Sequence, residues 1–578
     1  MTQTRSELDR LRELLEQWNR EYDPEMRMIR KPFSSPGYHT TLKGVEFTHP
    51  TRDSLVYALA LLDSEIPEYE ARAGEVIGKV LTLQDRDRSR PTYGIWPWFY
   101  EEPLEQMSPP DWNWADFCGK TLVLIARRHL HRLDPVLAER IRQSIFAACD
   151  AIIKRDVGPG YTNIAIMGAF VTLIAGEQYD HEPYRLYGLE RLRKFHAFTK
   201  ALGTFQEYNS PNYTPVAIIE LSGIHSETRD TEALSLTEEL LDIAWKMAAE
   251  HFHPATGQWG GPHSRSYRTM LNDYTLSFLD DALGGGTGLI EEERKVYSFE
   301  HYRKGIRCPD KYRRLFIEPS ARSIHVKISD GGGVSPDVWA YHAADERYSL
   351  GTFDREVMWN QRRNWLAYAR TSGGNAAIAL RFLHDGYDYS SAVFICAQHG
   401  WDTVFAIAFC TDGGDTHIGL DPISGSIQAS DLRLRFELLG DTGHLKLQAS
   451  ENQATVTDGE VLLQVNCLHA SFEGQRPVWE IGSGCGKEGD YRCLDYVVYS
   501  GESRPFRFTE IREAVLLFAA RLGGLWTEAD RLTAAAENGT ARAQLETAAA
   551  VLSVASPVKP AAKSVLLRES SSSVFIKE

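Results

Sequence analysis

The sequence predicts an α+β multidomain protein, with a closed array of helical hairpins followed by an antiparallel β-sandwich. The first observation is length, because 578 residues exceed what one small core accommodates. The second is an apolar periodicity of three and four residues that continues to about residue 285. The third is a change after about residue 320, where apolar and polar residues alternate between Gly, Asp or Asn turns.

The helical half is predicted from repeated amphipathic segments joined by short polar or aromatic connections. The segments lie at 53–64, 66–84, 113–132, 135–155, 163–177, 183–201, 214–225, 233–251 and 270–282. Short connections are typical of antiparallel helix pairs. No sequence identity is visible between the pairs, so a closed array is favoured over a tandem-repeat solenoid.

The strand half is predicted from segments such as TVFAIAF (403–409), LRLRFELLG (432–440) and EVLLQVNCLHASF (460–472). About 200 residues of this pattern indicate a large sandwich rather than a small appendage. We therefore expect a helical catalytic domain at 1–300, a linker at 301–320 and the antiparallel β-sandwich at 321–578.

Composition and charge exclude several classes of protein. A net charge of −16 argues against non-specific nucleic-acid binding, which needs clustered positive charge. No run of about 18 apolar residues predicts a membrane span. The eight cysteines are scattered without a CxxC pair, and the charged N-terminus has no apolar core of a secretory signal. A cytoplasmic location with reduced thiols is expected.

One apolar helix opens with an unexpected amide. The stretch YTNIAIMGAFVTLIAGE, 161–177, is apolar at almost every position, with Ala and Gly keeping it slim, yet Asn163 stands near its start. One interpretation is a helix cap from Thr162 or Asn163. The other is a functional side chain, and it depends on which residues lie near that helix start.

Two further polar clusters precede helices in the same way. FQEYNSPNYTPVAIIEL, 205–221, contains Glu207, Tyr208 and Tyr213, and Tyr213 lies 50 residues after Asn163, about the span of two helices. QWGGPHSRSYR precedes the helix at 270–282 and supplies the remaining polar candidates: His263, Arg265, Tyr267 and Arg268. Helix pairs in a ring would bring these starts to one end of the array.

These residues resemble the heparinase II/III-type and alginate-lyase-type polysaccharide lyases. The shared pattern is Asn at the start of a slim helix ending in AGE, then E-x-x-S-x-x-Y about fifty residues later, within 161–177 and 205–216. The resemblance implies an incomplete (α/α) toroid before the β-sandwich and β-elimination from a uronic-acid-containing glycan. Many relatives have His directly after the Asn, where this chain has Ile164, so His263 is the candidate for the supporting imidazole.

The residue types suit β-elimination, which removes the proton next to a carboxylate. Asn163, with His263 and Arg265, would bind the carboxylate and stabilise the developing enolate. The resemblance assigns the base to Tyr213, with Tyr267 and Tyr208 as alternatives. A phenol has a pKa near 10, so Arg265 and His263 are expected to lower the pKa of the base.

Aromatic and basic residues suggest where an anionic sugar chain binds. Two loops before helices carry flat aromatic faces that suit sugar rings, although packing is the other interpretation. The β-domain supplies histidines of the kind that related lyases borrow, and the basic segment 302–314 suits a polyanion or a solvated linker. The substrate-binding candidates are Trp96, Trp98, Tyr100, Trp112, Trp114, Glu207, Tyr208, Arg268, His342 and His399.

Two other functions stay open at this point. A glycoside hydrolase would use paired carboxylates from Glu207, Asp273, Asp280 and Asp281. A non-catalytic carbohydrate-binding protein would keep the aromatic residues without converging polar groups. The expected partner is an anionic oligosaccharide or polysaccharide, and a homo-oligomer is left open. No cofactor and no metal ligand set is predicted, although a structural divalent metal is not excluded.

Overall fold

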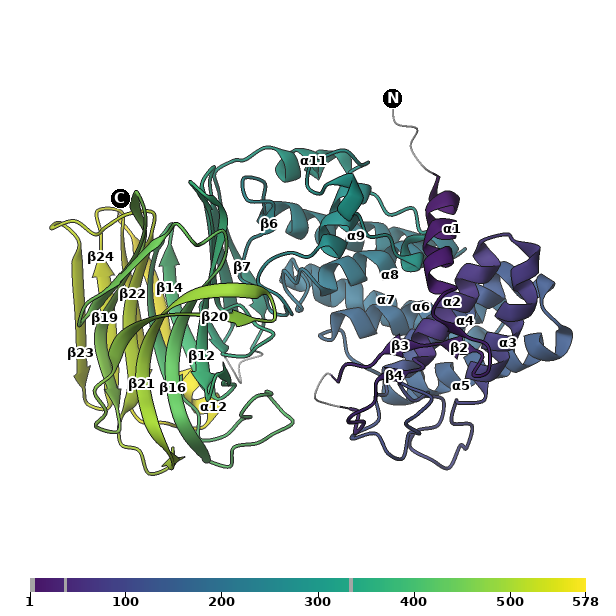
Figure 1. Ribbon diagram of the computed structural model, residues 1–578, viewed down its shortest axis with the longest axis horizontal. Coiled ribbons are helices and arrows are strands. Elements are labelled where there is room, and N and C mark those ends of the chain that lie inside the picture. The colour runs from purple at the N-terminus through teal and green to yellow at the C-terminus, as the bar shows by residue number, and fades with distance from the viewer. Residues whose placement is uncertain (1–5, 36–38, 332–335, 578) are drawn as a thin grey trace. The chain divides into compact units, whose positions relative to one another are not determined.

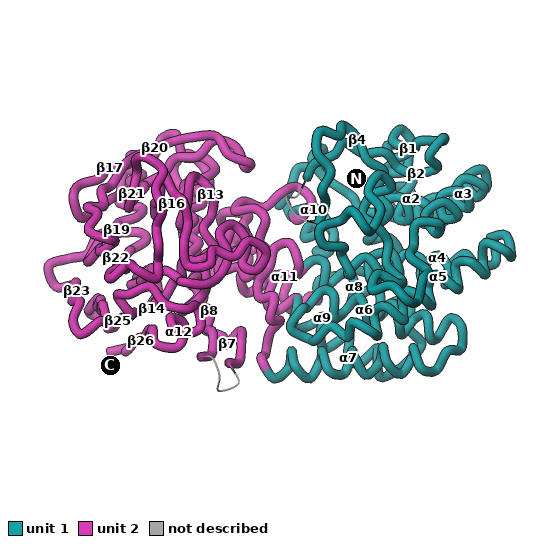
Figure 2. The backbone as a smooth tube through the Cα atoms, turned by 90° about the horizontal axis from the view of Figure 1, so that it is seen from below, with its two compact units in different colours: residues 1–201, 215–244, 276–308 teal, residues 202–214, 245–275, 309–578 magenta. Residues whose placement is uncertain are grey.

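The computed structural model describes residues 6–35, 39–331 and 336–577. A helical N-terminal region is followed by a C-terminal region of antiparallel sheets, which confirms the predicted fold class (Figure 1). The chain divides into two compact units (Figure 2). The first comprises 1–201, 215–244 and 276–308, and the second comprises 202–214, 245–275 and 309–578. The limits at 300 and 320 stay a prediction.

The helices of the N-terminal region begin and end within a few residues of the predicted ranges. Only the segment at 66–84 starts noticeably later, because Pro67–Tyr69 forms a 3₁₀ turn first. The helices are α1 (Glu7–Trp18), α2 (Thr51–Asp63), α3 (Glu70–Leu81), α4 (Trp114–His129), α5 (Pro135–Arg155), α6 (Thr162–Gln178), α7 (Glu182–Leu202), α8 (Tyr213–Glu227), α9 (Thr231–His251) and α10 (Asp273–Ala282). Helix α1 was not among the predicted ranges, and a capping box between Ser6 and Asp9 begins it.

Burial separates an inner from an outer set of helices. Helix α6 is buried from Thr162 to Gly176, whereas α5 and α7 keep one exposed face. Glycines let the backbones of α6 and α7 approach. A Cβ on Gly176 would lie 2.3 Å from the backbone nitrogen of Arg185, and one on Gly188 would lie 2.5 Å from that of Leu173. The slim Ala/Gly character of the sequence therefore follows from close helix packing.

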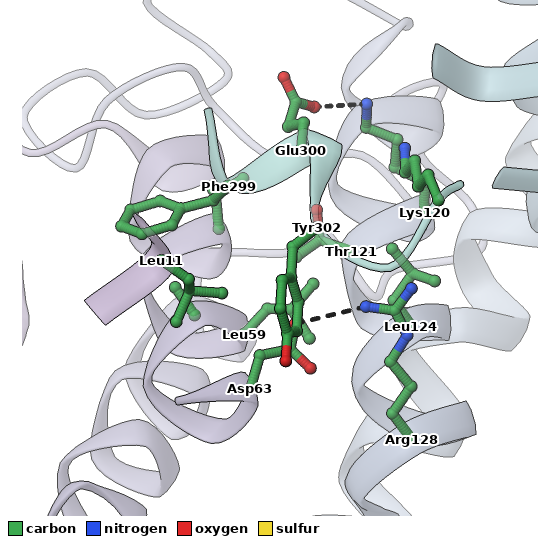
Figure 3. A pocket seen from close by; sticks show the side chains of 13 residues that line it. Leu11, Leu59, Asp63, Lys120, Thr121, Leu124, Arg128, Phe299, Glu300 and Tyr302 are labelled. Atoms are coloured by element: carbon green, nitrogen blue, oxygen red, sulfur yellow. Dashed lines mark hydrogen bonds and ion pairs between the residues drawn. The ribbon is translucent and has the colours of Figure 1, made fainter. Parts of the chain in front are cut away.

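A buried ion network lies inside the first unit. Lys120 of α4 is only 4% exposed and pairs with Glu220 of α8 and with Glu300, whose carboxylate is 2.6 Å away. Arg128 and Lys304 line the same small cavity, of about 20 Å³, in which Figure 3 shows the Lys120–Glu300 pair. A space of that size holds about one water molecule.

The second unit stacks three antiparallel sheets. Among the described residues, the largest sheet contains β7 (Arg322–Ser329), β8 (Val338–Ala344), β9 (Tyr348–Phe353), β11 (Trp365–Thr371), β12 (Gly374–His384), β13 (Tyr387–Asp388), β16 (Ser426–Gly440), β20 (Val478–Gly486) and β21 (Gly489–Arg507). The middle sheet contains β10 (Arg355–Val357), β14 (Ala392–His399), β15 (Asp402–Phe409), β17 (Lys446–Ala449), β18 (Gln453–Asp458), β19 (Glu460–Phe472) and β22 (Ala514–Leu522). A small sheet of β23 (Arg531–Glu537), β24 (Thr540–Glu546), β25 (Ala550–Pro557) and β26 (Ser571–Ile576) completes the stack.

Two apolar cores join these sheets, and a third patch holds the loop that carries the polar cluster. Residues such as Trp365 and Phe405 fill the core between the largest and middle sheets. The other face of the middle sheet packs on the small sheet. On the outer face of the largest sheet, Leu366 and Tyr368 pack with Met270, and the Tyr368 hydroxyl donates to the carbonyl of Thr269 at 2.5 Å. The loop 258–270 is therefore fixed on a sheet.

Shorter elements complete the chain. They are β1 (Tyr22–Asp23), β2 (Met28–Ile29), β3 (Lys31–Pro32), β4 (Phe47–Thr48), β5 (Phe252–His253), β6 (Gln258–Trp259), α11 (Asp310–Ile317) and α12 (Lys563–Glu569). The β5–β6 hairpin belongs to the second unit and leads directly into the loop 258–270. No helix in the described part of the chain is long and apolar enough to cross a bilayer.

Candidate active site

The E-x-x-S-x-x-Y stretch brings all three of its polar side chains to Arg265. The Glu207 carboxylate lies 3.5 Å from Nη1 of Arg265. Ser210 Oγ accepts from the backbone N–H of Tyr213 at 2.9 Å and donates to the carbonyl of Arg265 at 2.6 Å. Nη2 of Arg265 donates to the Tyr213 hydroxyl at 3.1 Å. The spacing found in the sequence thus builds one contact set inside the second unit.

Tyr213 and Tyr267 form a phenol pair beneath this guanidinium. Their hydroxyl oxygens lie 2.5 Å apart and share a hydrogen bond, and Nη2 of Arg265 also reaches the Tyr267 hydroxyl at 3.4 Å. Tyr267 is 38% exposed, and Asn212 Oδ1 accepts from its backbone N–H at 2.9 Å. The phenol pair therefore couples a half-buried hydroxyl to one that solvent or substrate reaches.

Two residues that the sequence did not single out hold Arg265 from the other side. Gln361 Oε1 accepts from Nε of Arg265 at 2.9 Å, and the guanidinium carbon lies 5.2 Å from the Trp359 ring and 4.7 Å from the Tyr213 ring. Each nitrogen of Arg265 thus contacts a side chain of the cluster. A substrate carboxylate would have to compete for those nitrogens.

Burial and the contact between Tyr213 and Arg265 shift the pKa of each residue in opposite directions. Burial raises the pKa of Tyr213 well above its usual range, and Arg265 only partly offsets this. Burial alone would lower the pKa of Arg265, but Tyr213, Tyr267 and Glu207 together raise it, so the guanidinium stays charged. In the unliganded protein Tyr213 is therefore a neutral phenol at pH 7, held by a permanent cation.

His263 does not supply the expected positive charge. Its side chain is 1% exposed, its Nδ1–H donates to the carbonyl of Asn209 at 2.6 Å, and burial lowers its pKa to about 3. The imidazole is therefore neutral at any physiological pH. The prediction that His263 helps to lower the pKa of the tyrosine is wrong for this reason, although the residue does lie beside the cluster.

Asn209 joins the two loops that carry the cluster. It is fully buried in the left-handed region at φ 49°, which Asn tolerates better than most side chains. Its Nδ2 donates to the carbonyls of Gly260 and Pro262 at 2.7 and 2.9 Å, and its Oδ1 accepts from Trp259 Nε1 at 2.6 Å. The sequence placed Asn209 in a polar cluster but gave it no role.

The other predicted residues of the second unit have mixed positions. Tyr208 is buried with its hydroxyl 2.6 Å from His251 Nε2, so it is a core residue and not a sugar contact. His342 is also buried, and its Nδ1–H donates to the carbonyl of Gly261 at 2.8 Å. Arg268 is partly exposed, 3.8 Å from the Glu488 carboxylate. His399 ends β14, and no contact among the described residues links it to the cluster.

Asn163 belongs to the first unit, so its convergence with the phenol pair stays a prediction. It is the second residue of α6 and 3% exposed. Helix α6 starts after Tyr161, whose own side chain makes no capping hydrogen bond, and the cap interpretation for Thr162 or Asn163 stays a prediction.

The aromatic candidates also lie in the first unit. Trp96 is fully buried and its Nε1 donates to the carbonyl of Val80 at 3.1 Å, so this ring packs in the core instead of facing a sugar. The remaining four, Trp98, Tyr100, Trp112 and Trp114, are partly exposed. The rings of Trp98 and Trp114 contact each other at a tilt of 34°, with their centroids 5.1 Å apart.

Two of the four carboxylates of the alternative hydrolase are engaged outside the cluster. Asp280 pairs with Lys295 at 2.8 Å and Asp281 pairs with Arg10 at 2.5 Å, both inside the first unit. Glu207 is 8% exposed and faces Arg265. The described residues also contain no group of three His, Cys, Asp or Glu side chains placed to hold a metal ion.

Comparison with known proteins gives one family match. Residues 19–293 match the model of a family described as a domain of unknown function (DUF8769). A search of curated protein sequences found no match.

Several solved structures are similar to this chain at very low identity. A Streptomyces coelicolor A3 chondroitin AC lyase in complex with chondroitin sulphate is 8% identical, with 95% of this chain and 89% of that chain covered and a TM-score of 0.48. A heparinase III is 9% identical over 94% and 85%, with a TM-score of 0.41. A heparan sulfate lyase mutant from Pedobacter heparinus is 10% identical over 96% and 94%, with a TM-score of 0.34. Such values identify neither a substrate nor a catalytic residue of this chain.

Proposed function

We propose that the protein is a lyase that cleaves a uronic-acid-containing glycan by β-elimination, with Tyr213 as the group that takes the proton. The observation that carries the proposal is the contact of one guanidinium nitrogen, Nη2 of Arg265, with both hydroxyls of the phenol pair. A cation in contact with two phenols stabilises a phenolate, which is the form that acts as a base.

The position of Tyr213 supports its role over that of Tyr267. Tyr213 is the first residue of α8, so its backbone lies at the positive end of a helix of 15 residues. It also makes the shorter of the two contacts with Arg265, 3.1 against 3.4 Å. Tyr267 donates to the phenolate when Tyr213 is ionised, and its exposure suits it to contact the leaving group.

The reaction needs one proton transfer at each end. The Tyr213 phenolate takes the proton from the carbon next to the carboxylate, and the C–H electron pair passes into an enolate. That pair then forms the new carbon–carbon double bond while the glycosidic C–O bond breaks. The leaving oxygen keeps the bonding pair and receives a proton from the phenol pair. The proposal leaves enolate stabilisation to Asn163, as the resemblance implies.

The activity should rise with pH because the base must lose a proton that burial holds on. The pKa of Tyr213 is raised in the unliganded protein, so the phenolate is a minor species at pH 7. We expect kcat/KM to increase about tenfold per pH unit from neutral to alkaline pH. A profile that is flat from pH 6 to pH 9 would exclude an unliganded phenol as the base.

The test is formation of unsaturated product, which absorbs in the ultraviolet, from defined uronate oligosaccharides. Tyr213→Phe removes one hydroxyl and should lower the single-turnover rate by at least about 10²–10⁴-fold. Tyr267→Phe should lower it less, since Arg265 still supports the base. Tyr499→Phe is the matched control, because its hydroxyl only donates to the carbonyl of Glu502.

Two outcomes would contradict the proposal. If Tyr213→Phe eliminates at the rate of the unmodified protein, the base lies elsewhere, and a severe loss in Tyr267→Phe would assign it to the partner phenol. Cleavage without any unsaturated product would replace β-elimination by hydrolysis.

A further inference from the structure

Arg363 lies beside the phenol-pair cluster without having a place in it. Its backbone bridges to His263 through two hydrogen bonds, from His263 N at 3.2 Å and to the carbonyl of His263 at 3.0 Å. Gln361, which accepts from Arg265, is two residues away. The side chain of Arg363 is therefore carried on the same pair of loops as the candidate catalytic residues.

The guanidinium of Arg363 is nearly buried and lacks a paired carboxylate. The residue is 8% exposed. Its Nη1 donates to the carbonyls of Asn360 and Arg362 at 2.7 and 3.2 Å, while its Nε is buried with no acceptor. No carboxylate of the described residues lies within ion-pair distance of it, and its Nη2 donates to none of them.

The acids that lie nearby are already engaged. Asp388 and Glu488 both act on the Arg363 charge through space. Asp388, however, accepts two hydrogen bonds from Arg381, at 3.0 and 2.7 Å. Glu488 accepts from the backbone N–H groups of Thr269 and Met270 at 2.7 and 3.0 Å. Neither carboxylate is free to turn toward Arg363 without giving up those bonds.

A buried cation without a carboxylate partner costs free energy. Burial lowers the pKa of Arg363 for the same reason. Arginine is also the side chain that binds carboxylates and sulfates with two parallel hydrogen bonds. We propose that Arg363 binds an anionic substituent of the sugar chain, a carboxylate or a sulfate, through the nitrogens that the protein leaves unpaired. This inference rests on the proposed function.

The contacts of Arg265 give such a second guanidinium a place in the proposed reaction, in addition to Asn163. All three nitrogens of Arg265 contact Glu207, Gln361 or the phenol pair. Arg265 therefore serves the proton transfer, and recognition of the substrate charge falls to a cation that is still uncommitted. Arg363 has that property, whereas Arg381 is held by Asp388 and Glu437.

The first experiment needs no substrate. Thermal unfolding of the full chain is followed with sodium sulfate or sodium glucuronate added at constant ionic strength. A ligand that binds only the folded state raises Tm, by about 2 °C at roughly ten times Kd. We expect this rise for the unmodified protein and for Arg314→Gln, whose side chain is 81% exposed, but not for Arg363→Gln. The more effective anion distinguishes a sulfate from a carboxylate site.

A loss of Nη1 hydrogen bonds could unfold the loop in Arg363→Gln, so Arg363→Lys is measured beside it. Lysine keeps the charge but presents a single point donor, and we expect it to fold and to respond to the anion at least tenfold more weakly. An unchanged anion response in Arg363→Lys would overturn the proposal, because a forked guanidinium would then be unnecessary.

Activity separates the failure of this inference from failure of the proposed function. With an active oligosaccharide, Arg363→Gln should raise KM about tenfold or more and leave the slope of the pH profile unchanged. An Arg363 variant with unchanged KM and an unchanged anion response would overturn the inference while the lyase proposal stands. An anion response that requires Arg363, in a protein that forms no unsaturated product, would keep the anion site and refute the lyase.

Discussion

Replacement of Asn209 should separate the two loops that build the candidate active site. Its side chain makes three hydrogen bonds: to Gly260, to Pro262 and from Trp259. Asn209→Ala removes all three at a position with no solvent exposure. The partners left behind are two carbonyl groups and an indole N–H, and each has to be buried without its bond.

The expected loss is large for one side chain. A buried partner left unsatisfied costs about 1–3 kcal/mol, so three of them cost roughly 3–9 kcal/mol. Alanine at φ 49° adds about 1 kcal/mol of backbone strain. The total is about 4–10 kcal/mol, which at about 2 °C per kcal/mol lowers the melting temperature of the second unit by roughly 8–20 °C.

Two further variants test the reasoning bond by bond. Asn209→Gly loses the same hydrogen bonds but adopts φ 49° freely, so it should be about 1 kcal/mol more stable than Asn209→Ala. Asn209→Asp keeps the acceptor for Trp259 but turns a carboxylate toward two carbonyls, so it should be the least stable of the three. Asn212→Ala is the control, since it loses only one bond, from the Tyr267 N–H.

The assay is differential scanning calorimetry, together with the near-ultraviolet circular dichroism of the Trp259 environment. Asn209→Ala within about 3 °C of the unmodified protein would refute the argument. It would mean that the remaining links, such as Ser264 Oγ donating to the carbonyl of Tyr208 at 2.8 Å, hold the loops alone. Equal stability of the Gly and Ala variants would remove the strain component.

The buried ion network of the first unit gives two further predictions. Lys120→Met should lower the free energy of unfolding by about 3–5 kcal/mol, because Glu220 and Glu300 then lose their shared cation. The measurement is urea unfolding. The control is Lys200→Met, at a site 61% exposed, which should change the free energy of unfolding by less than about 0.5 kcal/mol. Burial lowers the pKa of Lys304 to about 8 from 10.5, so the unfolded chain binds more protons between these values and stability rises with pH there. Lys304→Met lacks this group, so its free energy of unfolding minus that of the unmodified protein should fall by up to about 3 kcal/mol as the pH rises from 8 to 10.5. A difference that stays constant over this range would contradict the lowered pKa of Lys304.

Helices and alternating strands were predictable because each is a local pattern. The range 135–155 was predicted exactly as α5 (Pro135–Arg155), since Asp134 caps it and Pro135 occupies its first turn. Strand β22 (Ala514–Leu522) was missed because AVLLFAARL is buried on both faces and has no alternation. The strand segments of the small sheet, rich in Ala and Ser, likewise carry a weak signal.

The site was predictable only where a local pattern encodes it. Glu207, Ser210 and Tyr213 were found through their spacing, and all three meet Arg265. Gln361 and Arg363 come from a turn about a hundred residues further along, and nothing in WNQRRNW marks them as partners of the 258–268 loop. Their roles arise from the way the sheet holds both loops, which no single stretch of sequence encodes.

The charge of His263 was mispredicted for a related reason. Sequence neighbours such as Arg265 and Tyr267 indicate chemistry, but whether an imidazole is charged depends on burial, which comes from distant segments. The carbonyl of Asn209 and the surrounding core make it neutral. Arg265 stays charged because Glu207 and the phenol pair face it and raise its pKa.

The first turn of α8 explains why positioning and chemistry coincide in this stretch. Ser210 caps the N–H of Tyr213, and in the same position its hydroxyl donates to the carbonyl of Arg265. The helix therefore cannot begin at Tyr213 without drawing the Arg265 loop toward the phenol. The guanidinium then lies where it stabilises negative charge on the Tyr213 oxygen. A serine three residues before the tyrosine is thus a structural requirement of the proposed base.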